Sequence, residues 1–250
     1  MRLLSNFFAL IGNYITLIRK VFSRPEKGII YIRRIWAEMY NLGYTSIIIV
    51  LIISVFIGAV ICIQMALNLE SPFIPKELIG YATREIIVLE FSSTIVALIL
   101  AGKVGSSIAS EIGTMRITEQ IDALEIMGVN SASYLILPKI ISSVLFFPFL
   151  TILSMGVGIG GGYLMAAFTD IMELKDYMTG IRYALNDFYF SYAMIKAAVY
   201  AFLITSIAGF YGYYAQGNSL EVGKASTKAV VASCIAILAS DLILTQLLLT

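Results

Sequence analysis

The sequence predicts an all-α integral membrane protein. We expect an N-terminal interfacial amphipathic helix, five transmembrane helices (six are possible) and a short cytoplasmic helix between two of them. Two observations predict this class. Of the 250 residues, 59% are hydrophobic and only 13% are charged, whereas about 25% of the residues in a soluble domain are charged. In addition, several apolar runs approach the ~20 residues that a membrane-spanning helix needs.

The first predicted region covers residues 1–44. Apolar side chains recur every three or four residues over residues 1–24, with Arg19 and Lys20 among the polar residues between them. This spacing favours an amphipathic helix lying in the membrane interface. A signal peptide is the competing interpretation, but no small-residue cleavage site follows. Trp36, beside two arginines, is also typical of an interface.

Residues 45–250 form the predicted transmembrane domain. Its expected spans are residues 45–65, 86–109, 134–167, 192–213 and 229–249. The third expected span is long and contains Pro148, so it is either one kinked helix or two membrane segments. Polar connections are expected at residues 68–83, 110–130, 169–187 and 215–228.

Basic residues predict the orientation of these spans. With five spans and a cytoplasmic N-terminus, five of the 17 lysines and arginines fall on the outer side, and the other twelve fall on the inner side. The outer residues are Lys76, Arg84, Lys175, Arg182 and Lys196. Because basic residues concentrate in cytoplasmic loops, we expect a multi-pass membrane protein with its N-terminus and residues 110–130 in the cytoplasm.

Several kinds of site are disfavoured by composition. The chain has no histidine, which removes histidine-based acid–base catalysis and histidine metal ligands. Its two cysteines, Cys62 and Cys234, lie in apolar runs, so a disulfide framework or a cysteine metal cluster is not expected. The net charge of +1 gives no indication of a nucleic-acid partner.

Residues 111–130 are the most informative segment. On a continuous helix, four acidic residues would share about a third of the circumference, and three apolar residues would lie opposite. The acidic residues are Glu111, Glu119, Asp122 and Glu125, and the apolar residues are Ile117, Ile121 and Leu124. Such a helix, expected at about residues 111–127, is either a docking element for a soluble partner or a solvated connection on the membrane surface.

This segment closely resembles the signature of the MlaE/YrbE-type permeases, the membrane subunits of lipid-transporting ABC systems. The matching residues are Ala101-Gly102-Lys103-Val104-Gly105 and Glu111-Ile112-Gly113-Thr114-Met115-Arg116-Ile117-Thr118-Glu119-Gln120. Later motifs are also similar: Leu137-Pro138-Lys139, the glycine run at 156–162, residues 223–227, and Asp241-Leu242-Ile243-Leu244-Thr245. The resemblance covers about residues 45–249.

The resemblance implies a homodimeric permease of a bacterial inner membrane that moves phospholipid between the inner and outer membranes. It implies an ATPase partner bound through a cytoplasmic coupling helix, and an outer-side partner with a lipid-binding MCE domain. The implied ATPase-coupling residues are Glu111, Gly113, Met115, Arg116, Glu119, Gln120, Asp122 and Leu124. One departure is visible after Arg84-Glu85-Ile86, because Ile87-Val88 replaces the family's Gly-Pro and Glu90 follows.

The nucleotide is expected on the partner. A Walker loop needs Gly-x4-Gly-Lys-(Ser/Thr), and the nearest approach here is Gly217-x5-Gly223-Lys224-Ala225, with the wrong spacing and an alanine at the metal position. We therefore expect a subunit that is not itself an enzyme, that binds no cofactor or metal, and that depends on ATP and Mg²⁺ held by a separate ATPase.

Charged residues inside membrane spans are costly and are usually paired or hydrated. Arg84, Glu85, Lys196 and Asp241 are expected at similar depth near the outer face, where they form either a lipid head-group pocket or gate, or salt bridges that orient the spans. The resemblance covers each of these positions. For Glu90 we favour a protonated or interhelically bonded carboxyl group.

Small residues at helical spacing predict close helix packing. The relevant pairs in the third span are Gly156 with Gly160 and Gly158 with Gly162. Two other function classes remain as alternatives to the ABC permease. One is an ion-coupled secondary transporter that uses Glu90 and Asp241. The other is a membrane lipid-modifying enzyme, which is disfavoured because the acidic residues near the spans are scattered.

Overall fold

The computed structural model describes residues 2–23, 28–69, 73, 75–169 and 172–249, and every regular element within these ranges is a helix. Five helical segments are long and apolar enough to cross a membrane: Tyr31–Asn68, Glu77–Ile117, Ser131–Phe168, Asp187–Tyr213 and Ser219–Leu249. At 1.5 Å per residue, even the 27-residue segment extends about 40 Å, beyond the ~30 Å hydrocarbon core. The all-α membrane class with five spans is confirmed.

The chain forms two compact units. Unit 1 comprises Met1–Thr45, Leu98–Phe146 and Val199–Ile243, and unit 2 comprises Ser46–Ala97, Phe147–Ala198 and Leu244–Thr250. Three long helices, α8 (Ser131–Phe168), α10 (Asp187–Tyr213) and α11 (Ser219–Leu249), contribute residues to both units.

Unit 1 begins with α1 (Arg2–Phe22), the amphipathic helix that the sequence predicts. One side of α1 packs on the protein, because Leu17 and Val21 are fully buried and Tyr14 hydrogen-bonds Ser206 on α10 at 2.8 Å. Phe8 and Phe22 remain exposed, as an interfacial helix requires. Arg24 and Lys27, two of the basic residues in the orientation count, lie outside the described residues.

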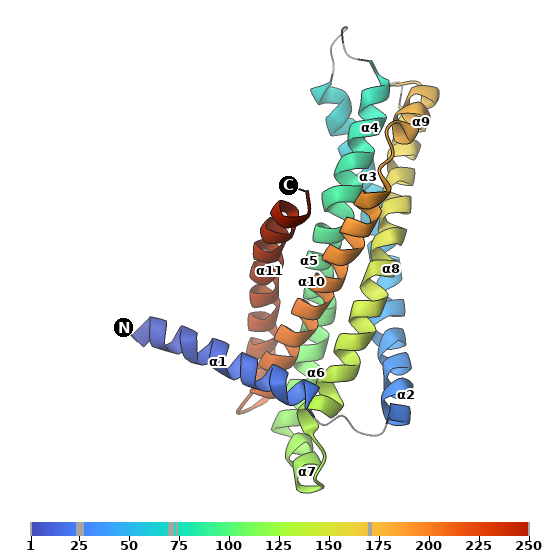
Figure 1. Ribbon diagram of the computed structural model, residues 1–250. Helices are drawn as coiled ribbons and strands as arrows, with labels where there is room; N and C mark the ends of the chain where they lie inside the picture. Colours follow the sequence, from blue (N-terminus) through green and yellow to red (C-terminus); the bar gives the residue numbers. More distant parts are fainter. Residues whose placement is uncertain (1, 24–27, 70–72, 74, 170–171, 250) are drawn as a thin grey trace. The chain divides into compact units, whose positions relative to one another are not determined.

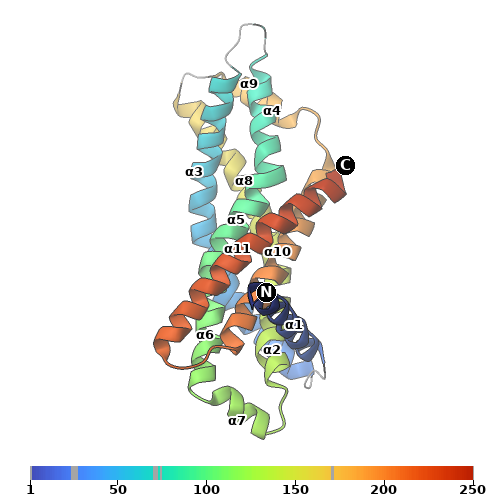
Figure 2. The ribbon, with the colours of Figure 1, turned by 90° about the vertical axis from the view of Figure 1, so that its left-hand side faces the viewer.

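The rest of the N-terminal region continues into the first span. Helix α2 (Gly28–Glu38), the π-helical turn η1 (Met39–Tyr44) and α3 (Thr45–Asn68) follow one another without a break. Later in unit 1, η3 (Ala101–Gly105) leads into α6 (Ser106–Ile117) and α7 (Gln120–Ile126). Figure 2 shows α7 turning away from α6 before the chain returns into α8.

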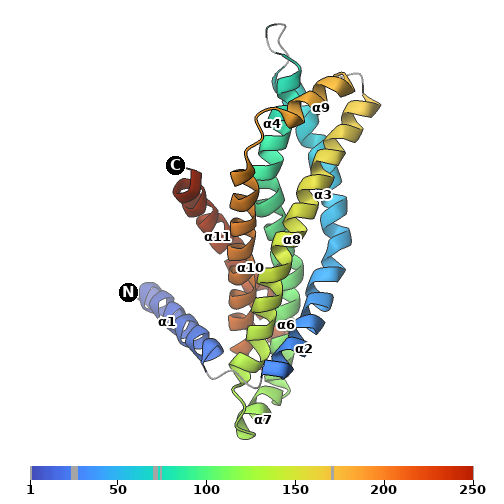
Figure 3. The same cartoon turned by 45° about the vertical axis from the view of Figure 1, so that its right-hand side comes forward.

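Unit 2 contains most of α3, together with α4 (Glu77–Ile86), the π-helical segment η2 (Ile87–Ile95), part of α5 (Val96–Leu100) and α9 (Leu174–Arg182). Helices α4 and α9 lie side by side (Figures 1 and 3). Glycines permit this contact, since a Cβ atom on Gly80 would lie 2.5 Å from the Tyr177 carbonyl oxygen, and one on Gly180 would lie 2.0 Å from that of Glu77. Tyr177 is fully buried and donates to the Ile159 carbonyl at 2.9 Å.

Four expected boundaries are corrected. The second span begins at Glu77, inside the region expected to be a loop; its Pro72 lies outside the described residues. Helix α9 occupies part of the expected polar connection at 169–187, and α11 begins at Ser219 instead of residue 229. Helix α8 is one continuous helix through Pro148, so the two-segment alternative is wrong. The helices at Glu77 and Ser219 begin with polar turns. The expected spans began later because they were defined by the length of each apolar run and not by helix-forming residues.

Candidate functional site

The connection between the second and third spans, residues 111–127, is called the coupling segment below. It was expected to be a single helix, but α6 ends at Ile117 and α7 begins at Gln120. Glu119 separates them in the left-handed conformation, with φ 60°. Non-glycine residues rarely adopt this conformation. The expected acidic face, which assumed one helical register, is therefore divided between two helices.

The end of α7 is well defined. Gly128 has φ 78°, its N–H donates to the Glu125 carbonyl at 3.0 Å, and the N–H of Val129 donates to the Leu124 carbonyl at 3.1 Å. These two bonds form a Schellman motif, in which glycine allows the left-handed turn that ends a helix. The helix end at Gly128 agrees with the sequence prediction.

Three of the four acidic residues are held in separate ion pairs. The Asp122 carboxylate lies 2.6 Å from the Arg116 guanidinium across the α6–α7 break. Glu111 lies 2.8 Å from Lys139, and Glu125 lies 2.8 Å from Lys20. Among the described residues, Glu119 has no ion pair and its side chain is exposed. The segment therefore presents one unpaired carboxylate instead of four.

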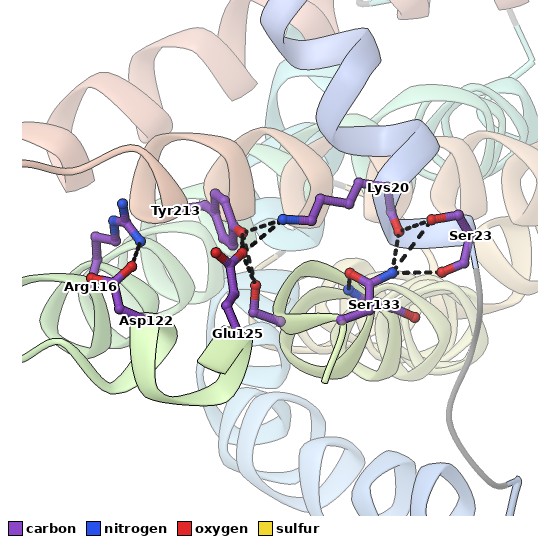
Figure 4. Close-up of polar contacts among 9 residues, drawn as sticks. Lys20, Ser23, Arg116, Asp122, Glu125, Ser133 and Tyr213 are labelled. Carbon is purple, nitrogen blue, oxygen red and sulfur yellow. Dashed lines mark hydrogen bonds and ion pairs between the residues drawn. The ribbon is translucent and has the colours of Figure 1, made fainter. Parts of the chain in front are cut away.

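Glu125 is the centre of a polar network that joins α1, α7, α8 and α10 (Figure 4). Its Oε1 accepts hydrogen bonds from Lys20 Nζ at 2.8 Å, Ser131 Oγ at 2.8 Å and the Tyr213 hydroxyl at 2.9 Å. Asn130 fixes the same end of α1 by donating to the carbonyl oxygens of Lys20 and Ser23. The hydrogen bond from Lys20, followed by those from Ser131 and Tyr213, lowers the pKa of Glu125 to about 2.

A buried lysine joins three helices of unit 1 through two ion pairs. Lys139 on α8 is 3% exposed, and its ammonium lies 2.8 Å from both Glu38 on α2 and Glu111 on α6. A buried charge requires such compensation. The sequence resemblance included Lys139, but its two carboxylate partners are remote in sequence and were not predicted.

The other implied coupling residues have diverse surroundings. Gly113 is buried, and a Cβ atom there would lie 3.0 Å from Val222 on α11, so its small size serves packing. Met115 and Leu124 are partly buried, whereas Gln120 is exposed and donates to Thr118 Oγ1 at 3.1 Å. Ile126 and Met127, which the motif does not include, are 87% and 68% exposed. The tip of the coupling segment, residues 119–127, thus exposes polar groups at Glu119 and Gln120 and apolar groups at Ile126 and Met127.

The charged groups that were expected near the outer face also have partners. Arg84 on α4 pairs with Glu85 and donates to the carbonyl oxygens of Ile181 and Tyr183 at 2.8 and 2.7 Å. It therefore satisfies carbonyl groups at the C-terminal end of α9, which otherwise lack helical donors. The sequence did not predict α9, so this contact was not foreseen.

Lys196 on α10 is fully buried, and its ammonium lies 3.1 Å from both carboxylate oxygens of Glu90 on η2. This agrees with the interhelically bonded alternative for Glu90. Lys196 also contacts the Tyr192 hydroxyl at 3.1 Å. In unit 1, the Asp241 carboxylate accepts a hydrogen bond from Tyr200 at 2.7 Å. The convergence of Arg84, Glu85, Lys196 and Asp241 in one pocket stays a prediction.

The departure from the family motif falls on unusual backbone. Residues 87–95, which include Ile87-Val88 and Glu90, form a π-helical segment within an otherwise continuous helix. Wide turns of this kind are frequent at functional sites. Among the described residues, no group of three or more His, Cys, Asp and Glu side chains is arranged to hold a metal ion.

Most of the chain is similar to one family of known proteins. The family model described as Permease MlaE matches residues 35–247. A probable ABC transporter permease protein of Rickettsia bellii is 34% identical over 218 residues, covering 87% of this chain and 84% of the relative. The chloroplastic protein TRIGALACTOSYLDIACYLGLYCEROL 1 of Arabidopsis thaliana is 30% identical over 227 residues, covering 91% and 65%.

The intermembrane phospholipid transport system permease protein MlaE of Haemophilus influenzae is 32% identical over 215 residues, covering 84% of this chain and 81% of the relative. The family match includes all five spans almost completely and the whole coupling segment. This chain is a multi-pass membrane protein that belongs to the MlaE permease family.

Proposed function

We propose that this permease carries phospholipid between the inner and outer membranes of a bacterium, and that a separate ABC ATPase drives it. The observation that carries the proposal is the coupling segment, which joins two spans and presents exposed groups at its tip. The relatives' names support both parts, since they include an ABC transporter permease and an intermembrane phospholipid transport permease.

The ATPase docks on the tip of the coupling segment in this proposal. Glu119 and Gln120 offer exposed polar groups, and Ile126 and Met127 offer apolar contact area. Glu111, Arg116 and Asp122 act indirectly by fixing the segment through ion pairs. Gly113, Met115 and Leu124 support it by packing. ATP and Mg²⁺ belong to the partner, and the permease itself performs no hydrolysis.

Lipid passage requires two copies of the chain in this proposal. Helix α11 exposes a stripe of apolar side chains spaced by four, three and four residues: Val231, Ile235, Leu238 and Leu242. Such a stripe faces either lipid or another apolar helix. We assign it to a homodimer that encloses a central cavity, because five spans are too few to surround a lipid. An MCE-domain protein on the outer side exchanges lipid with that cavity.

Polar groups near the outer face are proposed to control the passage of lipid through the cavity. Arg84, Glu85, Lys196 and Asp241 are proposed to form the lipid head-group pocket or its gate, with Glu90 as the immediate counter-ion of Lys196. The N-terminus is proposed to be cytoplasmic, in agreement with the excess of basic residues on that side.

A purified complex tests the ATPase assignment. Glu119→Lys and Ile126→Asp should each abolish co-purification of the ATPase and its permease-dependent turnover, because they alter exposed docking groups and remove no ion pair seen among the described residues. Glu173→Lys, an exposed carboxylate on the opposite side of the proposed topology, is the matched control. ATPase binding that survives both docking variants contradicts the assignment.

Transfer of a fluorescent phospholipid between proteoliposomes and acceptor vesicles tests the cargo. ATP-dependent transfer is expected only with the complete complex. Transfer that follows an ion gradient and needs no ATPase would instead establish the secondary transporter that Glu90 and Asp241 permit.

A further inference from the structure

A hollow of about 320 Å³ lies in unit 1, where α10 ends and α11 begins. Its volume falls at the lower end of the range for small-molecule sites. Its walls come from the end of α10, the connecting turn and the first turns of α11. The lining residues that carry chemistry are Tyr211, Tyr214, Gln216, Glu221, Lys224 and Lys228.

The turn that frames the hollow has a defined geometry. Gly217 has φ +104°, a conformation that favours glycine. Asn218 Oδ1 then accepts hydrogen bonds from the N–H groups of Leu220 and Glu221 at 3.2 and 3.3 Å, which caps the start of α11. On the neighbouring α6, Gly113 allows Val222 to pack closely. The lysines therefore stand on a fixed helix start.

The hollow has the chemistry of an anion site. Lys224 and Lys228 are four residues apart and so share one face of α11. Lys224 is paired with Glu221 at 2.6 Å, whereas no hydrogen bond or ion pair of Lys228 occurs within the described ranges. Nor do the hydroxyl groups of Tyr211 and Tyr214 have a hydrogen-bond partner there. The net charge of the hollow is positive, because two ammonium groups face one carboxylate. The two hydroxyl groups add hydrogen-bond donors.

Its aromatic walls suit a ligand that also has an apolar part. The ring of Phe210 contacts those of Tyr211 and Tyr214, with centroid separations of 5.4 and 5.2 Å. The hollow also lies at the adjoining ends of two candidate spans, Asp187–Tyr213 and Ser219–Leu249. Tyrosine and lysine at span ends are typical of the level of the lipid head groups, and basic pockets there bind anionic lipids.

We propose that this hollow binds the phosphate head group of an anionic phospholipid from the adjacent leaflet. The phosphate contacts Lys224 and Lys228, the tyrosine hydroxyl groups donate to its oxygens, and the glycerol part lies against the aromatic rings. Glu221 competes with the phosphate for Lys224. This lipid-binding proposal rests on unit 1 alone, and it does not depend on the ATPase or on transport.

The test is lipid binding by the purified protein in nanodiscs of phosphatidylcholine that contain increasing fractions of phosphatidylglycerol. Wild-type protein should enrich phosphatidylglycerol around itself. K224Q/K228Q should weaken that binding roughly thirtyfold, since each of the two lysines near a bilayer surface adds about 1 kcal/mol of attraction and about 1.4 kcal/mol corresponds to tenfold. K76Q/K175Q removes the same charge from exposed positions elsewhere and should bind like wild type.

Two single variants distinguish a lost binding site from misfolding of the double variant. K228Q removes an ammonium that has no hydrogen-bond or ion-pair partner among the described residues, and it should give a partial loss. E221Q frees Lys224 from its counter-ion and should tighten binding. Equal binding by wild type and K224Q/K228Q, or an equal loss in K76Q/K175Q, overturns the proposal.

Inorganic phosphate distinguishes the two sources of the anion. Millimolar phosphate should compete only weakly with phosphatidylglycerol, because it lacks the glycerol and acyl parts. Saturable phosphate binding that depends on Lys224 and Lys228, with no preference for phosphatidylglycerol over phosphatidylcholine, overturns the lipid assignment.

Discussion

The ammonium of Lys20 lies 2.8 Å from the Glu125 carboxylate, although 105 residues separate them in the chain. This contact joins the last turn of α1 to the coupling segment. Both side chains are more than 40% exposed, and exposed ion pairs contribute only about 0–1 kcal/mol. The pair therefore serves to orient α1 against α7, and it adds little to overall stability.

The first prediction concerns this orientation. Lys20→Gln should increase amide hydrogen exchange in the last turn of α1 and in α7, while the midpoint of thermal unfolding in detergent changes little. Hydrogen exchange read by mass spectrometry reports both helices separately. The charge reversal K20E/E125K should restore part of the protection. Unchanged exchange in both helices would show that Asn130 and Tyr213 hold α1 in place without the ion pair.

The second prediction follows from the pKa of Glu125. In the folded protein this pKa is about 2, below the ordinary value of 4.5. The network's contribution to stability is therefore complete above about pH 4.5 and is lost as the pH falls toward 2. Carbon-13 NMR of the Glu125 carboxyl group should show an ionised side chain at pH 4. In Lys20→Met the midpoint should move toward 4.5, and an unmoved midpoint contradicts the assigned cause.

The third prediction concerns the buried cation on α8. Lys139→Met should destabilise the protein because Glu38 and Glu111 lose their shared partner. Removing one member of a buried pair costs about 3–5 kcal/mol, and the half-exposed Glu111 reduces this to roughly 2 kcal/mol. Denaturant or thermal unfolding in detergent measures the loss. The triple variant E38Q/K139M/E111Q should recover much of it, and failure to recover would point to lost packing.

The fourth prediction concerns the ion pair between Lys196 on α10 and Glu90 on η2. Glu90→Gln removes the carboxylate that lies 3.1 Å from the fully buried Lys196 ammonium, so the unfolding midpoint should fall by more than it does in Glu85→Gln. Lys196 keeps the Tyr192 hydroxyl and the Leu89 carbonyl at 3.1 and 3.4 Å. Arg84, the partner of Glu85, keeps two closer carbonyl acceptors at 2.8 and 2.7 Å. The double variant E90L/K196M removes both charges and should be more stable than Glu90→Gln. An equal midpoint for both would show that Lys196 does not need this counter-ion.

Apolar periodicity and run length predicted α1 and all five spans, because burial in a bilayer imposes a strong local pattern. They did not predict the break at Glu119, since glutamate is a good helix former and no glycine or proline marks the position. Helix α9 was missed because it is short and polar. The pairs Lys20–Glu125, Lys139–Glu38 and Lys196–Glu90 join residues about 100 positions apart, and such pairings are not readable from one sequence.

The glycines of α8 also show that one sequence cannot reveal which residues of two helices meet. Small-residue spacing predicted close packing at four positions, yet a Cβ atom at Gly156 or Gly160 would meet nothing within 4 Å. Gly162 is a close contact, as predicted. The tightest glycine on α8 that faces another helix backbone is Gly161, outside the predicted pairs, where a Cβ atom would lie 2.2 Å from the Val55 carbonyl oxygen on α3. Spacing identifies a helix rich in small residues, but the facing helix decides which of them matter.

The fifth prediction uses this contrast. Gly161→Ala should force α3 and α8 apart and lower the unfolding midpoint, because the clash is with backbone and no side chain can move aside to relieve it. Overpacking of this kind costs about 1–3 kcal/mol. Gly160→Ala adds the same methyl group one residue away in open space and should be neutral or slightly stabilising, since alanine favours the helix. Thermal unfolding of the two variants in the same detergent compares them, and equal midpoints would refute the close approach of α3 and α8 at this position.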